Sequence, residues 1–272
     1  MTRPISVIVR AATLIILAAL PHRSAAQTTI KTSLPAPYYH GFKGGFVLYD
    51  RNADRFTVYQ PGECRRRVTP ASTFKILNSL IGLETGVIRD EHFVIPWDSV
   101  HREIESWNRD HDLASAIANS VVPYYQELAR RVGRERMSAL IDSTGYGNND
   151  ASGPIDRFWL GSTLLISPWE QVDFLRRLYD GRLPFSGRSI DIVKKILILE
   201  RTPAYVLRGK TGYCDDRSGD IVGWFVGYVE KAGNVYFFAL DMASPDVARD
   251  GDEILKERKA SAIEILRKLG VL

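Results

Sequence analysis

Segments typical of β-strands lie near both ends of this chain and enclose a middle whose apolar spacing is helical. Four runs are rich in β-branched and aromatic residues: Gly45–Asp50, Phe56–Tyr59, Ile221–Val229 and Val235–Met242. The last two are joined across Gly233-Asn234, a dipeptide that favours a tight hairpin turn. A chain with strands at both ends must return to one sheet after its helical middle.

The middle and the end of the chain carry the helical signals. Four apolar residues recur at helical spacing before Gly86, a plausible C-terminal stop: Phe74, Leu77, Leu80 and Ile81. We predict a mostly helical region over 113–143, a short helix over Gln171–Leu183 and an amphipathic closing helix over Ile254–Leu269. Together these elements predict an α+β sandwich with an inserted helical lobe.

Composition limits the classes of partner. The chain has 272 residues, of which 45% are hydrophobic and 25% charged, enough for one large domain or two packed lobes. The formal net charge of +4 is spread along the chain, and only Arg65–Arg67 and the ends of the closing helix cluster. This pattern predicts a solvated surface and no nucleic-acid partner.

Residues 1–26 have the pattern of a signal peptide. Arg3 and Arg10 form a positive region, Ala11–Leu20 is apolar, and Ser24-Ala25-Ala26 supplies small residues before Gln27. The apolar stretch is short for a membrane span, and no cysteine follows it to carry a lipid. We therefore expect cleavage near Ala26, a periplasmic or secreted protein, and no stable membrane association.

The chain contains two cysteines, Cys64 and Cys214. An oxidising compartment permits a disulfide between them, but two isolated free thiols are an equally good interpretation. Neither cysteine has the paired spacing with histidine or cysteine that a metal site needs, so we predict no metal.

Ser72-Thr73-Phe74-Lys75 is the segment with the clearest chemical meaning. A serine three residues before a lysine shares a helix face with it, and a hydroxyl becomes a nucleophile when a neighbouring base removes its proton. Pro70 places Ser72 in the first helical turn, where free N–H groups favour developing negative charge. The Ser72 N–H is therefore a candidate half of an oxyanion hole.

Lys75 can act as a base only if its charge is suppressed. A helix N-terminus and an apolar site both disfavour a cation, so the pKa of Lys75 should fall. The neutral amine could serve directly or could add carbon dioxide to form a carbamate, and the residues alone leave both states open. Lys210-Thr211-Gly212 on a strand edge and Ser120 are weaker signals when each is taken alone.

Taken together, these motifs resemble a family. Ser72-x-x-Lys75 with Lys210-Thr211-Gly212 matches the pattern of serine β-lactamases and penicillin-binding proteins. Further segments make the chain look like a class D, oxacillinase-type β-lactamase: Pro70–Lys75, Tyr146–Asn148, Phe158–Leu160, Trp107–Asp110, Tyr125–Arg130 and Gly223–Gly227. The resemblance covers nearly all of 27–272. It implies a central antiparallel sheet flanked by helices, with an α/β lobe of about 27–66 and 168–272 and a helical lobe of about 67–167.

The resemblance also implies catalytic roles. Ser72 would attack the β-lactam carbonyl, and N-carboxylated Lys75 would act as general base, so that carbon dioxide or bicarbonate is the only added component. The Trp159 indole N–H would steady the carbamate, beside an apolar wall that includes Phe74 and Val122. Ser120 and Lys210 would relay a proton to the departing ring nitrogen.

Substrate-binding roles follow in the same way. The substrate would bind along Thr211, Gly212 and Tyr213, and the Tyr213 N–H would complete the oxyanion hole. Arg258 would bind the substrate carboxylate, with Lys259 as the competing assignment. The chain departs from the family pattern at two places. The middle motif reads Ser120-Val121-Val122, and the usual Phe-Trp-Leu-Glu-Gly reads Phe158-Trp159-Leu160-Gly161-Ser162, which leaves the packing of that loop open.

The resemblance implies an enzyme that opens β-lactam rings, penicillins first. Two other functions are compatible with the same motifs: the covalent sensor domain of a β-lactam receptor, and a cell-wall transpeptidase or carboxypeptidase that deacylates slowly. A sensor would carry membrane helices and a protease region, and no such segments are seen in the sequence. The preferred β-lactam and the oligomeric state cannot be read from the residues.

Overall fold

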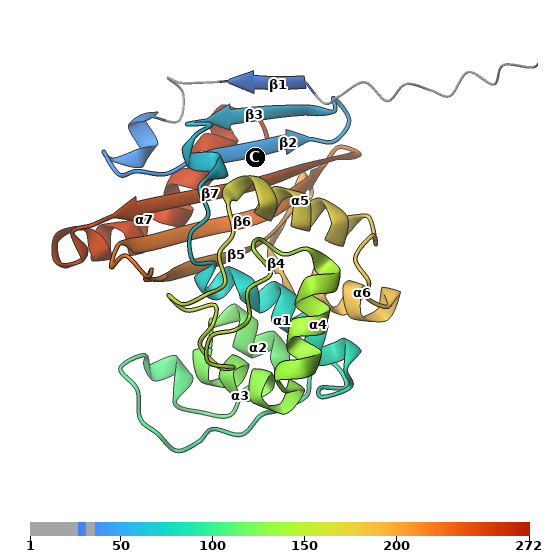
Figure 1. Ribbon diagram of the computed structural model, residues 1–272. Helices are drawn as coiled ribbons and strands as arrows, with labels where there is room; N and C mark the ends of the chain where they lie inside the picture. Colours follow the sequence, from blue (N-terminus) through green and yellow to red (C-terminus); the bar gives the residue numbers. More distant parts are fainter. Residues whose placement is uncertain (1–26, 31–35) are drawn as a thin grey trace, which may run out of the picture.

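A computed structural model describes residues 27–30 and 36–272 (Figure 1). Its centre is a seven-stranded sheet in the order β1-β3-β2-β7-β6-β5-β4. The strands are β1 (Gln27–Ile30), β2 (Phe46–Asp50), β3 (Arg55–Tyr59), β4 (Ile198–Arg201), β5 (Tyr205–Asp215), β6 (Ile221–Lys231) and β7 (Asn234–Ser244). All neighbouring strands are antiparallel except the pair β1 and β3. The predicted α+β class is confirmed.

The sheet is covered by helices on both faces, as Figure 1 shows. Helix α7 (Val247–Lys268) contacts β6 and β7 on one face, and α5 (Pro168–Tyr179) contacts β7 and β2 on the other. The remaining helices are α1 (Lys75–Glu84), α2 (Leu113–Ala118), α3 (Val122–Val132), α4 (Arg134–Thr144) and α6 (Gly187–Ile196). Short 3-10 turns are η1 (Ala36–Tyr39), η2 (Glu63–Arg65), η3 (Ala71–Phe74) and η4 (Glu105–Trp107).

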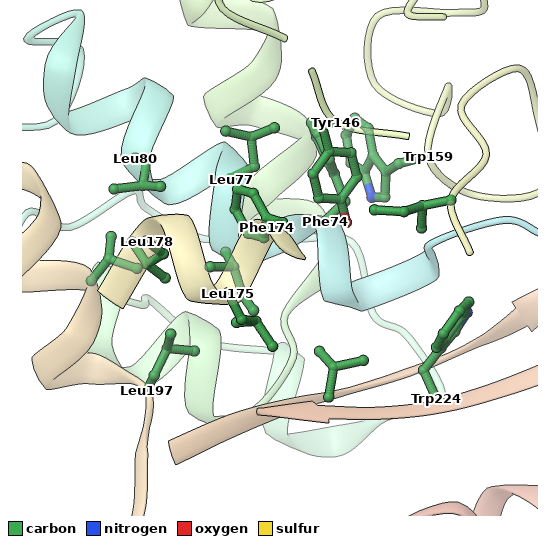
Figure 2. Close-up of a cluster of buried hydrophobic side chains, with 14 of the residues drawn as sticks. Phe74, Leu77, Leu80, Tyr146, Trp159, Phe174, Leu175, Leu178, Leu197 and Trp224 are labelled. Carbon is green, nitrogen blue, oxygen red and sulfur yellow. The ribbon is translucent and has the colours of Figure 1, made fainter. Parts of the chain in front are cut away.

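The central strands carry two hydrophobic cores because successive side chains point to opposite faces. On β6, Trp224 and Val226 belong to the core shared with α1 and α5, whereas Phe225 and Val229 face α7. Figure 2 shows the first core, where Phe74, two residues after Ser72, and Leu77 of α1 lie near Phe174 and Leu175 of α5. The chemically distinctive segment is thus anchored by the main apolar core of the molecule.

The hairpin between β6 and β7 is confirmed with its turn one residue earlier than predicted. Lys231 pairs with Asn234, so the two turn residues are Ala232 and Gly233. Their φ angles are 49° and 74°, as a two-residue hairpin with the favoured twist requires. Asn234 instead begins β7, where its side chain bonds to the β2–β3 turn at Asn52.

Several elements differ from the sequence-based expectation. Helix α5 begins at Pro168, because Ser167 and Glu170 form a capping box, and the closing helix begins at Val247 with Asp246 as its cap. Helix α6 and strands β1 and β4 were not predicted. The lobe boundaries near residues 67 and 168 remain a prediction.

The predicted signal peptide, residues 1–26, lies outside the described residues. Within the part of the chain that is described, no helix is long and apolar enough to cross a membrane. Both cysteines are free thiols, Cys64 buried beside β2 and Cys214 on β5, which decides between the two alternatives left open by the sequence.

Asp241 is a buried carboxyl group on β7. Its Oδ1 accepts a 2.7 Å hydrogen bond from the Gly45 N–H, while its Oδ2 has no hydrogen-bond partner among the described residues. Burial raises its pKa to about 7, although the Gly45 N–H and Arg66 favour the charged form. Because the folded protein binds this proton more tightly than the unfolded chain, stability falls as the pH rises from about 4 to 7.

Replacing Asp241 by Asn should remove that loss. We expect Asp241→Asn to raise the free energy of unfolding at pH 8 by about 1–3 kcal/mol and to change it little at pH 4. Urea unfolding at both pH values measures the difference, with the exposed Asp191→Asn as control. An equal effect of Asp241→Asn at both pH values would contradict the assignment.

Candidate active site

Ser72 lies in a turn that ends where α1 begins. Ala71–Phe74 form the 3-10 turn η3, so the predicted first helical turn is tighter than an α-helix. Ala71 has a φ of 50°, an unfavourable conformation for a residue with a Cβ, directly before the serine. The Ser72 side chain is 7% exposed and lines a cavity of about 260 Å³. The hydroxyl is therefore accessible from the cavity while the turn that carries it is buried.

Lys75 is the first residue of α1 and is completely buried. Its Nζ lies 2.5 Å from Oγ of Ser72 and 3.5 Å from Oγ of Ser120, and 5.5 Å from the ring centroid of Tyr125. Burial and the neighbouring Lys210 hold the pKa of Lys75 well below its ordinary value. No ion pair involving Lys75 occurs within the described ranges, so the amine is suited to accept a proton.

Ser120 connects α2 to α3 and completes a three-residue cluster with Ser72 and Lys75. Its φ of 54° is again in the left-handed region, and α3 begins at Val122 with Pro123 next. Strained backbone of this kind is typical of functional sites. Val121 is buried, whereas Val122, the residue predicted for the apolar wall, lines the cavity; its role there stays a prediction.

The Lys210-Thr211-Gly212 segment lies on an open edge of β5. Strand β4 pairs with β5 only as far as Arg208, and the Gly209 N–H donates to Leu197 O on that side. Backbone groups of alternate residues in a strand point the same way, so the Tyr213 N–H also points to the open edge. An unpaired donor beside Ser72 is what an oxyanion hole requires.

A glycine allows β5 to approach the serine turn closely. A Cβ on Gly212 would lie 3.1 Å from Pro70 O and 3.2 Å from a methyl group of Thr73. Lys210, which precedes it by two residues, is 5% exposed, and its Nζ donates to Thr211 O at 3.1 Å. Burial, assisted by Arg258 and Lys259, lowers the pKa of Lys210 to about 7.

Arg258 reaches the cavity from α7. Helix α7 packs closely on β6 because Gly223 has no side chain: a Cβ there would lie 2.4 Å from Ile254. The Arg258 guanidinium lies 5.5 Å from the Tyr213 ring centroid, and burial lowers its pKa to about 10. Its Nε has no partner among the described residues. Arg258 lines the cavity with Ser72, and exposed Lys259 does not.

Trp159 is buried behind the serine turn. Its ring stacks on Phe74 with centroids 5.4 Å apart, as Figure 2 shows, and its carbonyl accepts from Thr69 Oγ1. Its indole Nε1 finds no acceptor within the described residues. A buried donor without an acceptor is costly and calls for a ligand or a modified neighbour.

The loop after Trp159 packs well despite its unusual sequence. Gly161 has a φ of 63°, and a Cβ there would lie 2.4 Å from Asp215 O. Its N–H donates to Thr69 Oγ1 at 3.0 Å. Glycine therefore fits this position, where the loop passes close to the end of β5.

The cavity brings together seven of the predicted residues: Ser72, Ser120, Val122, Thr211, Gly212, Tyr213 and Arg258. Lys75 and Lys210 contact two of these residues, Ser72 and Thr211, from the buried side. Trp159 is not among the described residues that line the cavity. Four further residues line the cavity: Ile104, which ends a loop expected to border the site, Trp107, which belongs to a segment of the family resemblance, and Asn119 and Leu255, which were not predicted. Ile104 and Leu255 are 48% and 43% exposed, and such exposed apolar side chains are not evident from sequence. Among the described residues, no group of three or more His, Cys, Asp or Glu could hold a metal ion.

Comparison with known proteins agrees with this geometry. The family model of the penicillin-binding-protein transpeptidase domain matches residues 22–267. Beta-lactamase OXA-48 of Klebsiella pneumoniae is 44% identical over 84% of each chain. The probable beta-lactamase YbxI of Bacillus subtilis is 43% identical over 84% of this chain and 82% of its own.

A solved structure and a regulatory protein complete the comparison. The crystal structure of a class D beta-lactamase, YbXI from Nostoc, superposes with a TM-score of 0.82 at 43% identity, covering 89% of this chain and all of that one. The regulatory protein BlaR1 of Bacillus licheniformis is 40% identical, but the match covers only 33% of its length. The folded chain and its serine–lysine cluster thus belong to the class D β-lactamases.

Proposed function

We propose that this enzyme hydrolyses the amide bond of β-lactam rings through an acyl-enzyme on Ser72. The observation that carries the proposal is the 2.5 Å contact between Ser72 Oγ and Lys75 Nζ. Lys75 is buried, and burial holds its pKa well below the ordinary value. A nucleophile next to a base of lowered pKa is the arrangement that covalent acyl transfer needs. Homology to class D β-lactamases over most of the chain supports the same reaction.

Acylation begins with attack of Ser72 Oγ on the β-lactam carbonyl carbon while the hydroxyl proton passes to the base at Lys75. The N–H groups of Ser72 and Tyr213 stabilise the negative charge on the carbonyl oxygen. The ring C–N bond then breaks, and Ser120 and Lys210 relay a proton to the departing nitrogen. A pKa near 7 suits Lys210 to this task, because the group both gives and takes a proton at neutral pH.

Deacylation uses the same base. A water molecule loses its proton to Lys75 and attacks the ester carbon, which releases the ring-opened acid and restores the Ser72 hydroxyl. Arg258 and Thr211, which share the cavity wall, hold the substrate carboxylate throughout, with Gly212 and Tyr213 as the strand against which the substrate lies. Penicillins, with a carboxylate next to the ring nitrogen, are the first substrates that this arrangement predicts.

We further propose that the working form of Lys75 is its carbamate. The neutral amine adds carbon dioxide, a C–N bond forms and one proton is released. Burial, the low lysine pKa and the unpartnered indole N–H of Trp159 all favour that modified state. Val122 and Phe74 would shield it from water.

Export of the protein after cleavage near Ala26, and the division into an α/β lobe and a helical lobe of 67–167, remain parts of this proposal. Periplasmic or extracellular localisation would let the enzyme meet β-lactams before they reach the enzymes that build the cell wall. Fractionation of expressing cells and N-terminal sequencing of the product would test the cleavage site.

Hydrolysis of a penicillin by purified protein in bicarbonate buffer tests the main proposal. We expect steady turnover, and a Ser72→Ala variant without activity. A covalent sensor or a slow transpeptidase would give a burst equal to the enzyme concentration and no turnover. That outcome, with an acyl adduct visible by mass spectrometry, would contradict hydrolysis as the function.

The Trp159 indole provides a test of the carbamate. We expect Trp159→Phe to lower kcat by about tenfold or more and to make activity depend strongly on added bicarbonate, because the loss of a buried donor weakens the modified lysine. Carbon-13 NMR with labelled bicarbonate should show a weaker carbamate signal at equal concentration. Trp97→Phe, which removes an indole that already donates to Val100 O, is the control. Equal bicarbonate dependence in both variants would refute the role.

Lys75 itself should reduce stability. The pKa of Lys75 is lower in the folded protein than in the unfolded chain. As the pH falls from the unfolded pKa toward the folded pKa, only the unfolded chain gains the proton, so the stability of the fold decreases. In bicarbonate-free buffer, Lys75→Met should abolish turnover and raise the free energy of unfolding at pH 7 by about 1–3 kcal/mol. The exposed Lys268→Met is the control in urea unfolding. A destabilised Lys75→Met variant would argue against a strained buried amine.

A further inference from the structure

A second hollow of about 360 Å³ adjoins the catalytic cavity at the open edge of β5. We call it the edge chamber. It is lined by residues from α2, the α6–β4 junction, β5 and α7. Thr211, Leu255 and Arg258 line both spaces, so these three side chains form the boundary between them.

The charged groups of the edge chamber all have one sign. Lys210, Lys256, Arg258 and Lys259 line it, and no carboxylate from the described part of the chain does. Lys256 lies 3.4 Å from Glu257, but no ion pair of the described chain involves the other three. Lys259 lines the chamber from α7, and its Nζ lies 6.0 Å from the ring centroid of Phe225. Cations held together without counter-charges are stabilised by an anionic ligand.

The chamber also offers apolar contacts. Leu199 and Leu255 are each 43% exposed, and Ile198, the first residue of β4, also lines the chamber. A ligand with a short apolar stem and an anionic end would cover these side chains and reach the lysines. Such a ligand fits better than a free inorganic ion, which would leave the apolar wall exposed to water.

We propose that the edge chamber is a second anion subsite, which takes a negatively charged substituent carried by the β-lactam next to its ring carboxylate. This inference rests on the proposed function, since Arg258 and Thr211 must hold that carboxylate at the boundary. A substituent on the neighbouring ring atom then continues from the boundary away from Ser72 and toward Lys259. The chain would favour dianionic over monoanionic substrates of the same ring system.

Two cephalosporins that differ only in that substituent provide the test. One ends in a carboxylate and the other in the corresponding primary amide, so shape is preserved and a single charge is removed. Binding is measured by calorimetry on the Ser72→Ala protein, which cannot be acylated, so the result does not depend on turnover. We expect the acid to bind about fivefold or more tightly than the amide at low salt.

Substitution of Lys259 should remove the preference. Adding Lys259→Glu to Ser72→Ala should lower the acid-to-amide affinity ratio by about fivefold or more, and Lys259→Gln should give an intermediate value. Lys268→Glu, the same charge change at the far end of α7, should leave the ratio unchanged. The proposal would be overturned by an acid-to-amide affinity ratio near one in the Ser72→Ala protein. It would also be overturned if adding Lys259→Glu left that ratio unchanged. Failure of the wild type to hydrolyse penicillin would instead refute the proposed function alone.

Discussion

The active site depends on one costly contact: a lysine buried beside a serine, with no carboxylate among residues 27–30 and 36–272 paired with it. Lys75 is held in place because α1 begins there and its apolar stripe, Phe74, Leu77 and Leu80, is packed in the largest core. The packing of that stripe offsets the desolvation of the amine. Its lowered pKa follows directly, and the proton transfer from Ser72 that we propose depends on it.

The other catalytic groups reach this contact through close backbone approaches. Gly212 lets β5 lie against the serine turn, Gly223 lets α7 bring Arg258 over the sheet, and Gly161 lets the tryptophan loop pass the end of β5. A Cβ at Gly223 or Gly161 would collide with a side-chain or main-chain atom, and one at Gly212 would make unusually tight contacts. Positive φ at Ala71 and Ser120 adds local strain beside both serines, which the surrounding core maintains.

Much of the fold could be predicted because its signals are local. The strands near residues 50 and 225, the hairpin and the helix after Ser72 all follow from period and turn residues. Helix α6 was missed although Ser186 caps it and Ile190 and Val193 are buried, because it spans only ten residues and its first turn, Gly187-Arg188-Ser189, carries no apolar signal. Strand β4 is short and mostly exposed, so it carries no alternation; only its pairing with β5 makes it a strand.

The sequence by itself determined the residue types and the order of the motifs: a serine and a lysine on one turn, a second serine, and a lysine-threonine-glycine segment. These imply a serine acyl-transfer enzyme of the class D pattern, since the chemistry depends on side-chain identity. Only the tertiary structure decided that both cysteines are free, that β5 has an open edge, that Leu255 lines both hollows, and that Lys259 lines the edge chamber while Arg258 lines both. The reason is physical: exposure, lowered pKa values and uncompensated charge arise from segments far apart in the chain, and no local pattern specifies them.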